Sequence, residues 1–148
     1  MNWLLDILTN PFLIAGVSSW LIAQVVKTIL HWIIYKKLDF KRIYGDGGMP
    51  SGHSATVSAL AVFCGLRLGF STPEFAIALI LAIIVCKDAT GVRREAGRQA
   101  EVLNELLKLF NEEDAQKLKE FIGHTPIQVF AGILIGISNA LLMHFVFL

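Results

Sequence analysis

Charged residues are scarce in this chain of 148 residues. They make up 17% of the sequence, whereas 55% of the residues are hydrophobic, and the mean hydropathy is +0.62. An ordinary soluble domain carries about 25% charged residues, so this composition excludes that class. The composition indicates a protein of the lipid bilayer, and the length allows one domain over residues 1–148.

Cysteine is equally scarce. Cys64 and Cys86 both fall in apolar stretches, and their separation fits neither a disulfide framework nor a metal-ligand motif. We interpret both as packing residues. The N-terminus lacks the basic start and small-residue cleavage site of a signal peptide, so residues 2–10 are expected to form a short amphipathic segment on the membrane. Internal repeats are absent, which favours a single small bundle.

Four stretches approach the roughly 20 apolar residues that a membrane-spanning helix needs. They cover residues 11–35, 50–69, 73–86 and 125–148. The third is short, but its helical pattern continues into the charged region beyond Lys87. We therefore predict an all-α fold, a polytopic membrane helical bundle with about four transmembrane helices.

Basic residues are distributed unevenly over the loops of such a bundle. With alternating spans, the loops 36–49 and 93–123 share one side, which carries Lys36, Lys37, Lys41, Arg42, Arg93, Arg94, Arg98, Lys108, Lys117 and Lys119. The other side holds both termini and the turn 69–72, with Arg67 alone. The positive-inside rule makes the basic side cytoplasmic. The predicted location is a bacterial inner membrane.

Local signals refine this layout. Thr72-Pro73 and Thr125-Pro126 each place a capping hydroxyl before a proline, as helix starts do. Apolar residues at helical spacing between spans three and four predict an amphipathic hairpin at the cytoplasmic interface, either a lid or only a cover for the bundle end. These residues are Val102, Leu103, Leu106, Leu107, Phe110, Leu118, Phe121 and Ile122. Small residues predict close helix packing. They are Gly132, Gly136 and Ala140 on the last span, and Ser54, Ser58, Ala61 and Gly65 on the second.

Polar residues gather at the cytoplasmic end of the bundle, in three places far apart in the sequence. These are Lys41-Arg42 with residues 50–53, residues 87–98, and residues 123–128. Two histidines at helix starts, facing several arginines and lysines, fit a phosphate ester. Amides at a helix start bind anions, arginine pairs with phosphate oxygens, and histidine can act as nucleophile or proton donor near neutral pH.

Three of these segments also carry a family resemblance. Pro50-Ser51-Gly52-His53, followed by His124, Gln128-Val129, Gly132 and Gly136, resembles the signature of type 2 phosphatidic acid phosphatases, a superfamily related to vanadium-dependent haloperoxidases. The runs GGMPSGHSA, DATGVRREAGRQAEVLN and GHTPIQVFAG are similar to its divergent, short bacterial and plant branch. The resemblance extends over about residues 41–136.

The resemblance implies a mechanism. His124 would be the nucleophile that attacks phosphorus, and His53 the general acid that protonates the leaving group. The phosphoryl oxygens would be held by substrate-binding residues from all three segments: Ser51, Gly52, Lys41, Arg42, Arg93, Arg94, Arg98 and Gln128. The implied substrate is a lipid phosphate monoester or diphosphate, hydrolysed through a phosphohistidine, and the scheme requires no cofactor.

The chain departs from the family pattern where a charge matters. No Arg-Pro pair follows Lys41, and no Ser-Arg pair precedes His124. The family's aspartate, four residues after the nucleophile, is Gln128, which can orient the imidazole but brings no charge. Asp88 is the best replacement, with Glu95 behind it. Either carboxylate could instead bind Mg²⁺, so this ion is not excluded.

Plainer interpretations stand beside these. Gln128 forms a capping box with Thr125 in its own right. Asp88 can simply pair with Arg93 or Arg94, and His124 can be a surface residue next to a helix cap. Lys27 shares one face of the first span with Gln24, Thr28 and His31. An intramembrane lysine indicates function, but we predict that this one snorkels to the interface. His144 lies too far along the last span to join the site.

Two rival functions remain open from the sequence. The first is a catalytically silent lipid-phosphate-binding or scaffold protein. The second is a component of a transporter or flippase, with the Lys27 face as its pathway. The expected partners are membrane lipids and a lipid phosphate substrate, with no nucleic acid. Four short spans around a polar site also favour pairing with a second copy of the chain.

Overall fold

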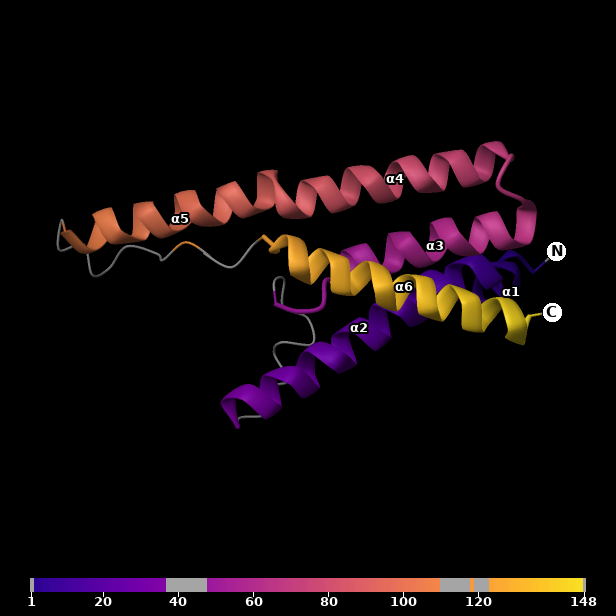
Figure 1. The fold of residues 1–148 in the computed structure, drawn as a ribbon, viewed down its shortest axis with the longest axis horizontal. Helices are drawn as coiled ribbons and strands as arrows, with labels where there is room; N and C mark the ends of the chain where they lie inside the picture. Colours follow the sequence, from indigo (N-terminus) through magenta and orange to yellow (C-terminus); the bar gives the residue numbers. More distant parts are fainter. Residues whose placement is uncertain (1, 37–47, 110–117, 119–122, 148) are drawn as a thin grey trace.

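The computed structural model describes residues 2–36, 48–109, 118 and 123–147. The helices are α1 (Trp3–Leu8), α2 (Pro11–Tyr35), α3 (Gly52–Leu68), α4 (Pro73–Thr90), α5 (Val92–Leu109) and α6 (Pro126–Val146), as Figure 1 shows. Within these residues every regular element is a helix, which confirms the all-α prediction. The expected N-terminal lead-in forms α1, which buries no residue.

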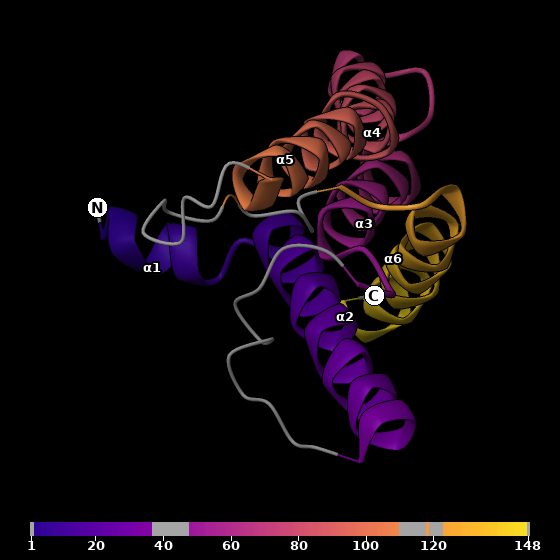
Figure 2. The same cartoon turned by 90° about the vertical axis from the view of Figure 1, so that its left-hand side faces the viewer.

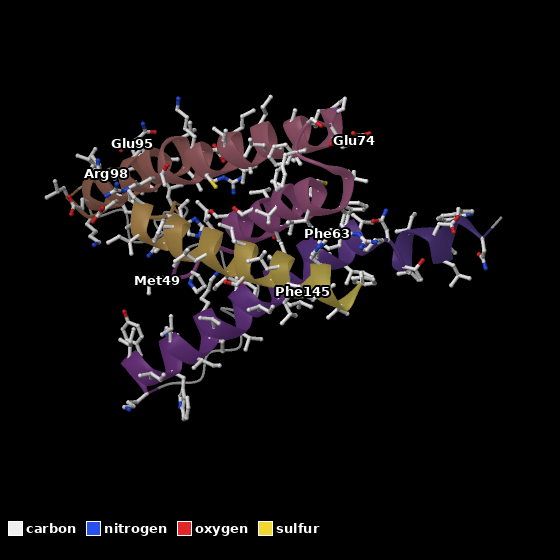
Figure 3. All side chains as sticks on the ribbon, turned by 45° about the vertical axis from the view of Figure 1, so that its right-hand side comes forward. Met49, Phe63, Glu74, Glu95, Arg98 and Phe145 are labelled. Carbon is white, nitrogen blue, oxygen red and sulfur yellow. The ribbon has the colours of Figure 1, made fainter. Side chains whose placement is uncertain are left out.

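α2, α3, the α4–α5 helix and α6 alternate in direction along the long axis of the molecule (Figure 1). Both termini and the turn between α3 and α4 lie at one end, where the Arg67 guanidinium donates a 3.1 Å hydrogen bond to the Phe147 carbonyl. The C-terminus of α2 and the N-termini of α3 and α6 lie toward the opposite end. In Figure 3, Glu74 marks the first end, and Glu95 and Arg98 mark the second. Among the described residues, Lys36 at the end of α2 and the arginines of α5 therefore lie toward this second end, opposite Arg67.

Three helices among the described residues are long and apolar enough to cross a membrane. They are α2, α6 and the nearly continuous α4–α5 helix, Pro73–Leu109. α3 is the remaining one of the four predicted spans. Its 17 residues lie at the lower limit of the roughly 17–25 residues of a spanning helix, and it runs between the two ends of the bundle (Figure 1). The chain is a polytopic helical membrane bundle in which α3 is the central helix.

α3 packs against α2, α4 and α6 (Figure 2). Its buried residues are mostly small, which lets neighbouring backbones approach closely. A Cβ atom added at Gly132 would lie 2.4 Å from the Ser51 carbonyl oxygen, and one at Gly136 would lie 2.4 Å from that of Ala55. The close helix packing that these small residues predict is confirmed, between α3 and α6.

Polar and aromatic contacts complete the packing of α3 and α6 on α2. Phe63 lies edge-on to Phe12, with ring centroids 5.3 Å apart. The Asn139 amide donates to the Ala15 carbonyl at 3.2 Å and to the hydroxyls of Ser18 and Ser19 at 2.8 Å. These hydrogen bonds join α6 to α2 inside the bundle, where water is not available to satisfy polar groups.

Two predicted helix starts are confirmed. The Thr72 hydroxyl accepts a hydrogen bond from the Phe75 amide at 3.4 Å, and the Thr125 hydroxyl accepts one from the Gln128 amide at the same distance. Each threonine is followed by a proline in the first helical turn. The capping group and the proline together fix where α4 and α6 begin.

α5 continues α4 past the end of the bundle (Figure 1). The Asn104 amide group exchanges two hydrogen bonds with the main chain of Leu118, at 2.8 and 2.9 Å, so residue 118 lies beside α5. Ala100 and Asn104 are buried, whereas Val102 and Leu103 are exposed. An amphipathic helix is confirmed, but it runs on from α4 instead of crossing the bundle end. Phe110, Phe121 and Ile122 lie outside the described residues.

Candidate active site

Main-chain contacts bring the predicted segments together. The Ser51 amide donates to the Gln128 carbonyl at 3.0 Å, and the His124 amide donates to the Ala89 carbonyl at 3.0 Å. Gly123 lies directly against Arg94, because an added Cβ atom would come within 2.2 Å of the Arg94 Cα atom. The starts of α3 and α6 and the junction of α4 with α5 therefore form one cluster at the basic end of the bundle.

The two histidines face each other within this cluster. The ring centroids of His53 and His124 are 6.2 Å apart, and the ring planes are inclined at 80°. His124 is 2% exposed, whereas His53 is exposed. The two imidazoles are therefore close enough to contact the same phosphoryl group.

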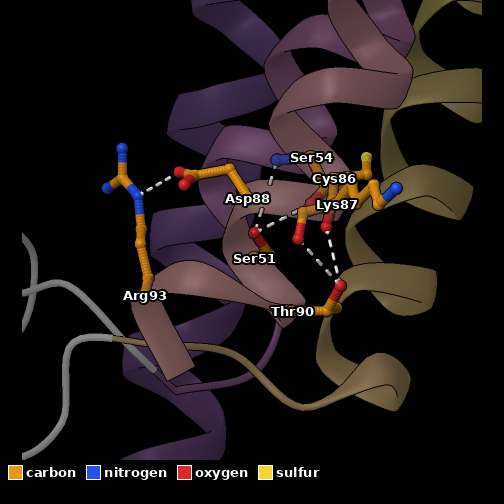
Figure 4. Close-up of polar contacts among 7 residues, drawn as sticks. All are labelled: Ser51, Ser54, Cys86, Lys87, Asp88, Thr90 and Arg93. Carbon is orange, nitrogen blue, oxygen red and sulfur yellow. Dashed lines mark hydrogen bonds and ion pairs between the residues drawn. The ribbon is translucent and has the colours of Figure 1, made fainter. Parts of the chain in front are cut away.

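Ser51 caps α3. It is fully buried, and its hydroxyl oxygen accepts hydrogen bonds from the Ser54 amide at 3.3 Å and the Ser54 hydroxyl at 3.0 Å (Figure 4). This cap orders the helix start that carries Gly52 and His53, whose amides have no carbonyl acceptor within their own helix. The role of Ser51 as a direct substrate ligand stays a prediction.

The carboxylates near the site pair with arginines. The Asp88 carboxylate accepts a 2.5 Å hydrogen bond from Arg93 Nε in an ion pair that is partly exposed (Figure 4). Glu95 and Arg98 form a second, exposed pair at 3.1 Å. The plainer interpretation of Asp88, a partner for Arg93, is therefore present in the structure. A direct role for Asp88 on the imidazole of His124 stays a prediction.

Gln128 has the structural role that the sequence also predicted, as part of a capping box with Thr125. Its side-chain carbonyl accepts a 2.9 Å hydrogen bond from the Thr125 amide, while the Thr125 hydroxyl accepts from the Gln128 amide. The two residues form a complete capping box at the start of α6. The glutamine that stands in place of the family's aspartate thus stabilises the helix start next to His124.

Lys27 and Gln24 of α2 are the site neighbours that the sequence reasoning missed. Lys27 is 5% exposed and Gln24 is 6% exposed, so the predicted snorkelling of Lys27 is wrong. A Cβ atom added at Gly48 would lie 3.6 Å from Lys27 Cδ, and one at Gly52 would lie 3.9 Å from Gln24 Oε1. This face of α2 packs against the turn that leads into α3. The i, i+3 spacing of the two polar residues was visible in the sequence, but the contact is tertiary.

Other residues singled out from the sequence lie away from this cluster or outside the described residues. Lys41 and Arg42 lie outside the described residues. His144 lies in the last turn of α6, far from His124, as predicted. Among the described residues, no group of three or more His, Cys, Asp and Glu side chains is placed to hold a metal ion. That the reaction requires no cofactor stays a prediction, and so does the binding of Mg²⁺ by Asp88 or Glu95.

Comparison with known proteins identifies the class. The sequence model of the divergent PAP2 family matches residues 8–139, so the chain belongs to this family, and the resemblance drawn from its motifs is confirmed. The chain is also 40% identical over 158 residues to the "Uncharacterized membrane protein YuiD" of Bacillus subtilis (strain 168), covering 97% of this chain and 100% of that protein. No solved structure matches the chain.

Proposed function

We propose that this chain is an integral membrane phosphatase that hydrolyses a lipid phosphate monoester or diphosphate through a phosphohistidine. The observation that carries this proposal is the 6.2 Å distance between the ring centroids of His53 and His124, which are 71 residues apart in the sequence, in a member of the divergent PAP2 family. Two imidazoles this close can contact the same phosphoryl group, one as nucleophile and the other as proton donor.

The reaction has two steps. In the first, a ring nitrogen of His124 attacks phosphorus, the bond from phosphorus to the lipid oxygen breaks, and His53 gives that oxygen a proton. In the second, water attacks the phosphohistidine, His53 takes the proton from water, and inorganic phosphate leaves as the bond to His124 breaks. His53 thus acts as acid and then as base, and both histidines return to their starting states.

Charge on the equatorial oxygens is stabilised by groups around the two rings. The amides of Gly52 and His53 belong to the first turn of α3, where the positive end of the helix dipole favours an anion. Arg94, whose backbone packs on Gly123, contributes a guanidinium. An amphiphilic substrate would keep its hydrocarbon chain in lipid while its headgroup reaches this end of the bundle, which we assign to the cytoplasmic side.

One observation favours a second function. Gln128 is engaged in a capping box and brings no charge to the imidazole of His124, so a lipid-phosphate-binding protein without turnover would keep the same anion site. Such a protein would bind phosphate and orthovanadate but release no phosphate from any lipid.

The direct test is phosphate release by the purified protein in mixed micelles. The substrates are phosphatidic acid, phosphatidylglycerol phosphate and a polyprenyl phosphate. The proposal predicts release from at least one of them, inhibition by orthovanadate, and loss of activity in His124→Ala. Equally slow release by the wild type and His124→Ala on all three would sink the enzymatic proposal.

A separate test addresses orientation. A reporter fused after Leu148 should report the extracytoplasmic side, because the C-terminus lies at the end opposite the active site (Figure 1). A cytoplasmic signal would overturn the assigned orientation without bearing on the chemistry.

A further inference from the structure

A buried lysine and a buried glutamine from α2 lie against the turn that precedes α3. Lys27 and Gln24 are one helical turn apart and are 5% and 6% exposed. The carbon stem of Lys27 passes Gly48, with Cδ and Cγ at 3.6 and 3.7 Å from where a Cβ atom would stand, and Gly48 has a φ of +82°. Glycine lets the chain take this left-handed conformation without strain, so the turn closes directly over the lysine stem.

The position of Lys27 indicates a function for its positive charge. An ammonium group inside a helical membrane bundle is costly, and such residues mark functional sites in membrane proteins. Gln24 lies beside Gly52, whose amide is part of the α3 start, so Lys27 and Gln24 approach the same helix start that holds His53. They reach it from α2, whereas the arginines reach the cluster from α5.

Two arginines of the cluster pair with carboxylates: Arg93 with Asp88, and Arg98 with Glu95. These two pairs lie partly in water, where charges are screened. A buried lysine acts through a lower dielectric and therefore interacts more strongly with an anion at the same distance.

We infer that Lys27, positioned with Gln24, is a further substrate-binding residue, one that favours a doubly charged phosphate monoester headgroup over a singly charged phosphodiester. The inference rests on the proposed phosphatase function for its substrate. With Lys27 and Gln24, α2 becomes a third part of the site. The other two parts are the starts of α3 and α6 and the α4–α5 junction.

The test uses Lys27→Met, because methionine replaces the charged stem with an apolar side chain of similar length. Lys27→Arg serves as the conservative variant. Lys36→Met is the matched control, since Lys36 lies at the exposed C-terminal end of the same helix. Lys27→Gln replaces Lys27→Met in the same comparison if the methionine variant does not purify as a folded protein.

Two readouts are measured on full-length protein in detergent. The first is KM and kcat for phosphatidic acid. The second is the concentration of orthovanadate that protects the protein against thermal unfolding, which needs no turnover. Lys27→Met should raise both KM and the protecting orthovanadate concentration about tenfold or more, as expected for loss of a charged contact worth a factor of ten in binding. Lys27→Arg should recover part of this loss, and Lys36→Met should match the wild type.

The outcomes separate the two claims. If Lys27→Met matches Lys36→Met in both readouts, the assignment of Lys27 is overturned while the phosphatase proposal stands. If the wild type releases no phosphate but orthovanadate protects it less well after Lys27→Met, the phosphatase proposal fails while Lys27 remains an anion-binding residue. A fall in kcat with unchanged KM and unchanged protection would also contradict a role in substrate binding.

Discussion

The Ser51 amide donates a hydrogen bond to the Gln128 carbonyl across 3.0 Å, which ties the start of α3 to the first turn of α6. His53 follows Ser51 by two residues, and His124 precedes Gln128 by four. One backbone contact therefore sets the relative position of the two helix starts that carry the histidines. Its geometry depends on Gly132, which lies against the Ser51 carbonyl oxygen.

Gly132→Ala is expected to destabilise the protein. The added Cβ atom would stand 2.4 Å from the Ser51 carbonyl oxygen, so α6 must move away from α3. Forcing an extra carbon into such a contact costs about 1–3 kcal/mol, which thermal unfolding in detergent would detect. Gly16→Ala is the control, because its Cβ atom would stand 3.5 Å from Thr56 Cγ2, an ordinary contact. Equal stability of the two variants would contradict the close packing of α6 on α3.

Gln128 is expected to act on stability more than on chemistry. Gln128→Ala removes the acceptor for the Thr125 amide and should lower stability by about 1 kcal/mol, a typical value for a lost cap. Its kcat should stay within about threefold of the wild type, a difference of less than about 1 kcal/mol in activation free energy. Gln128→Glu keeps an acceptor and should retain stability. If Gln128→Ala instead lowers kcat a hundredfold at unchanged stability, the glutamine orients His124.

Asp88 and Arg93 are expected to act as a pair. Because the ion pair is partly exposed, breaking it should change stability by no more than about 1 kcal/mol. In a double-mutant cycle that measures the rate of phosphate release, the double variant Asp88→Asn with Arg93→Gln should lose no more activity than the more harmful single variant. A large loss in Asp88→Asn with none in Arg93→Gln would show that Asp88 serves His124 directly, as the sequence analysis first predicted.

The two histidines should respond differently to the leaving group. A general acid contributes about 10²–10⁴-fold to rate, and it matters most when the departing oxygen is strongly basic. His53→Asn should therefore slow release from phosphatidic acid by this amount but act much less on an aryl phosphate with an acidic phenol. His124→Asn should lose activity on both substrates. Equal losses on the two substrates in His53→Asn would argue against proton donation by His53.

Features with local causes could be predicted from the sequence. The starts of α4 and α6 follow from a threonine and a proline that act within one turn. The close approach of α6 to a neighbouring helix follows from glycines spaced four residues apart, whereas its neighbour, α3, is known from the structure. These signals depend on neighbours along the chain, so the structure reproduces them.

Features with tertiary causes could not be predicted in this way. The burial of Lys27 depends on the turn at Gly48 packing over its stem, and a helical pattern alone is equally compatible with snorkelling. The central position of α3, enclosed by α2, α4 and α6, is likewise tertiary, because an apolar pattern does not say which helix its neighbours surround. The sequence also left open whether Gln128 or Asp88 had functional partners, and hydrogen-bond geometry was needed to identify the capping box and the ion pair.

The central claim is that His124 carries the phosphoryl group during turnover. It is tested most directly by incubating purified protein with ³²P-labelled phosphatidic acid, quenching in alkali, which preserves phosphohistidine, and locating the label by peptide mapping. We expect label on the peptide that contains His124 in the wild type and none in His124→Ala. Release of phosphate by the wild type with no labelled histidine, or label that persists in His124→Ala, would contradict the account.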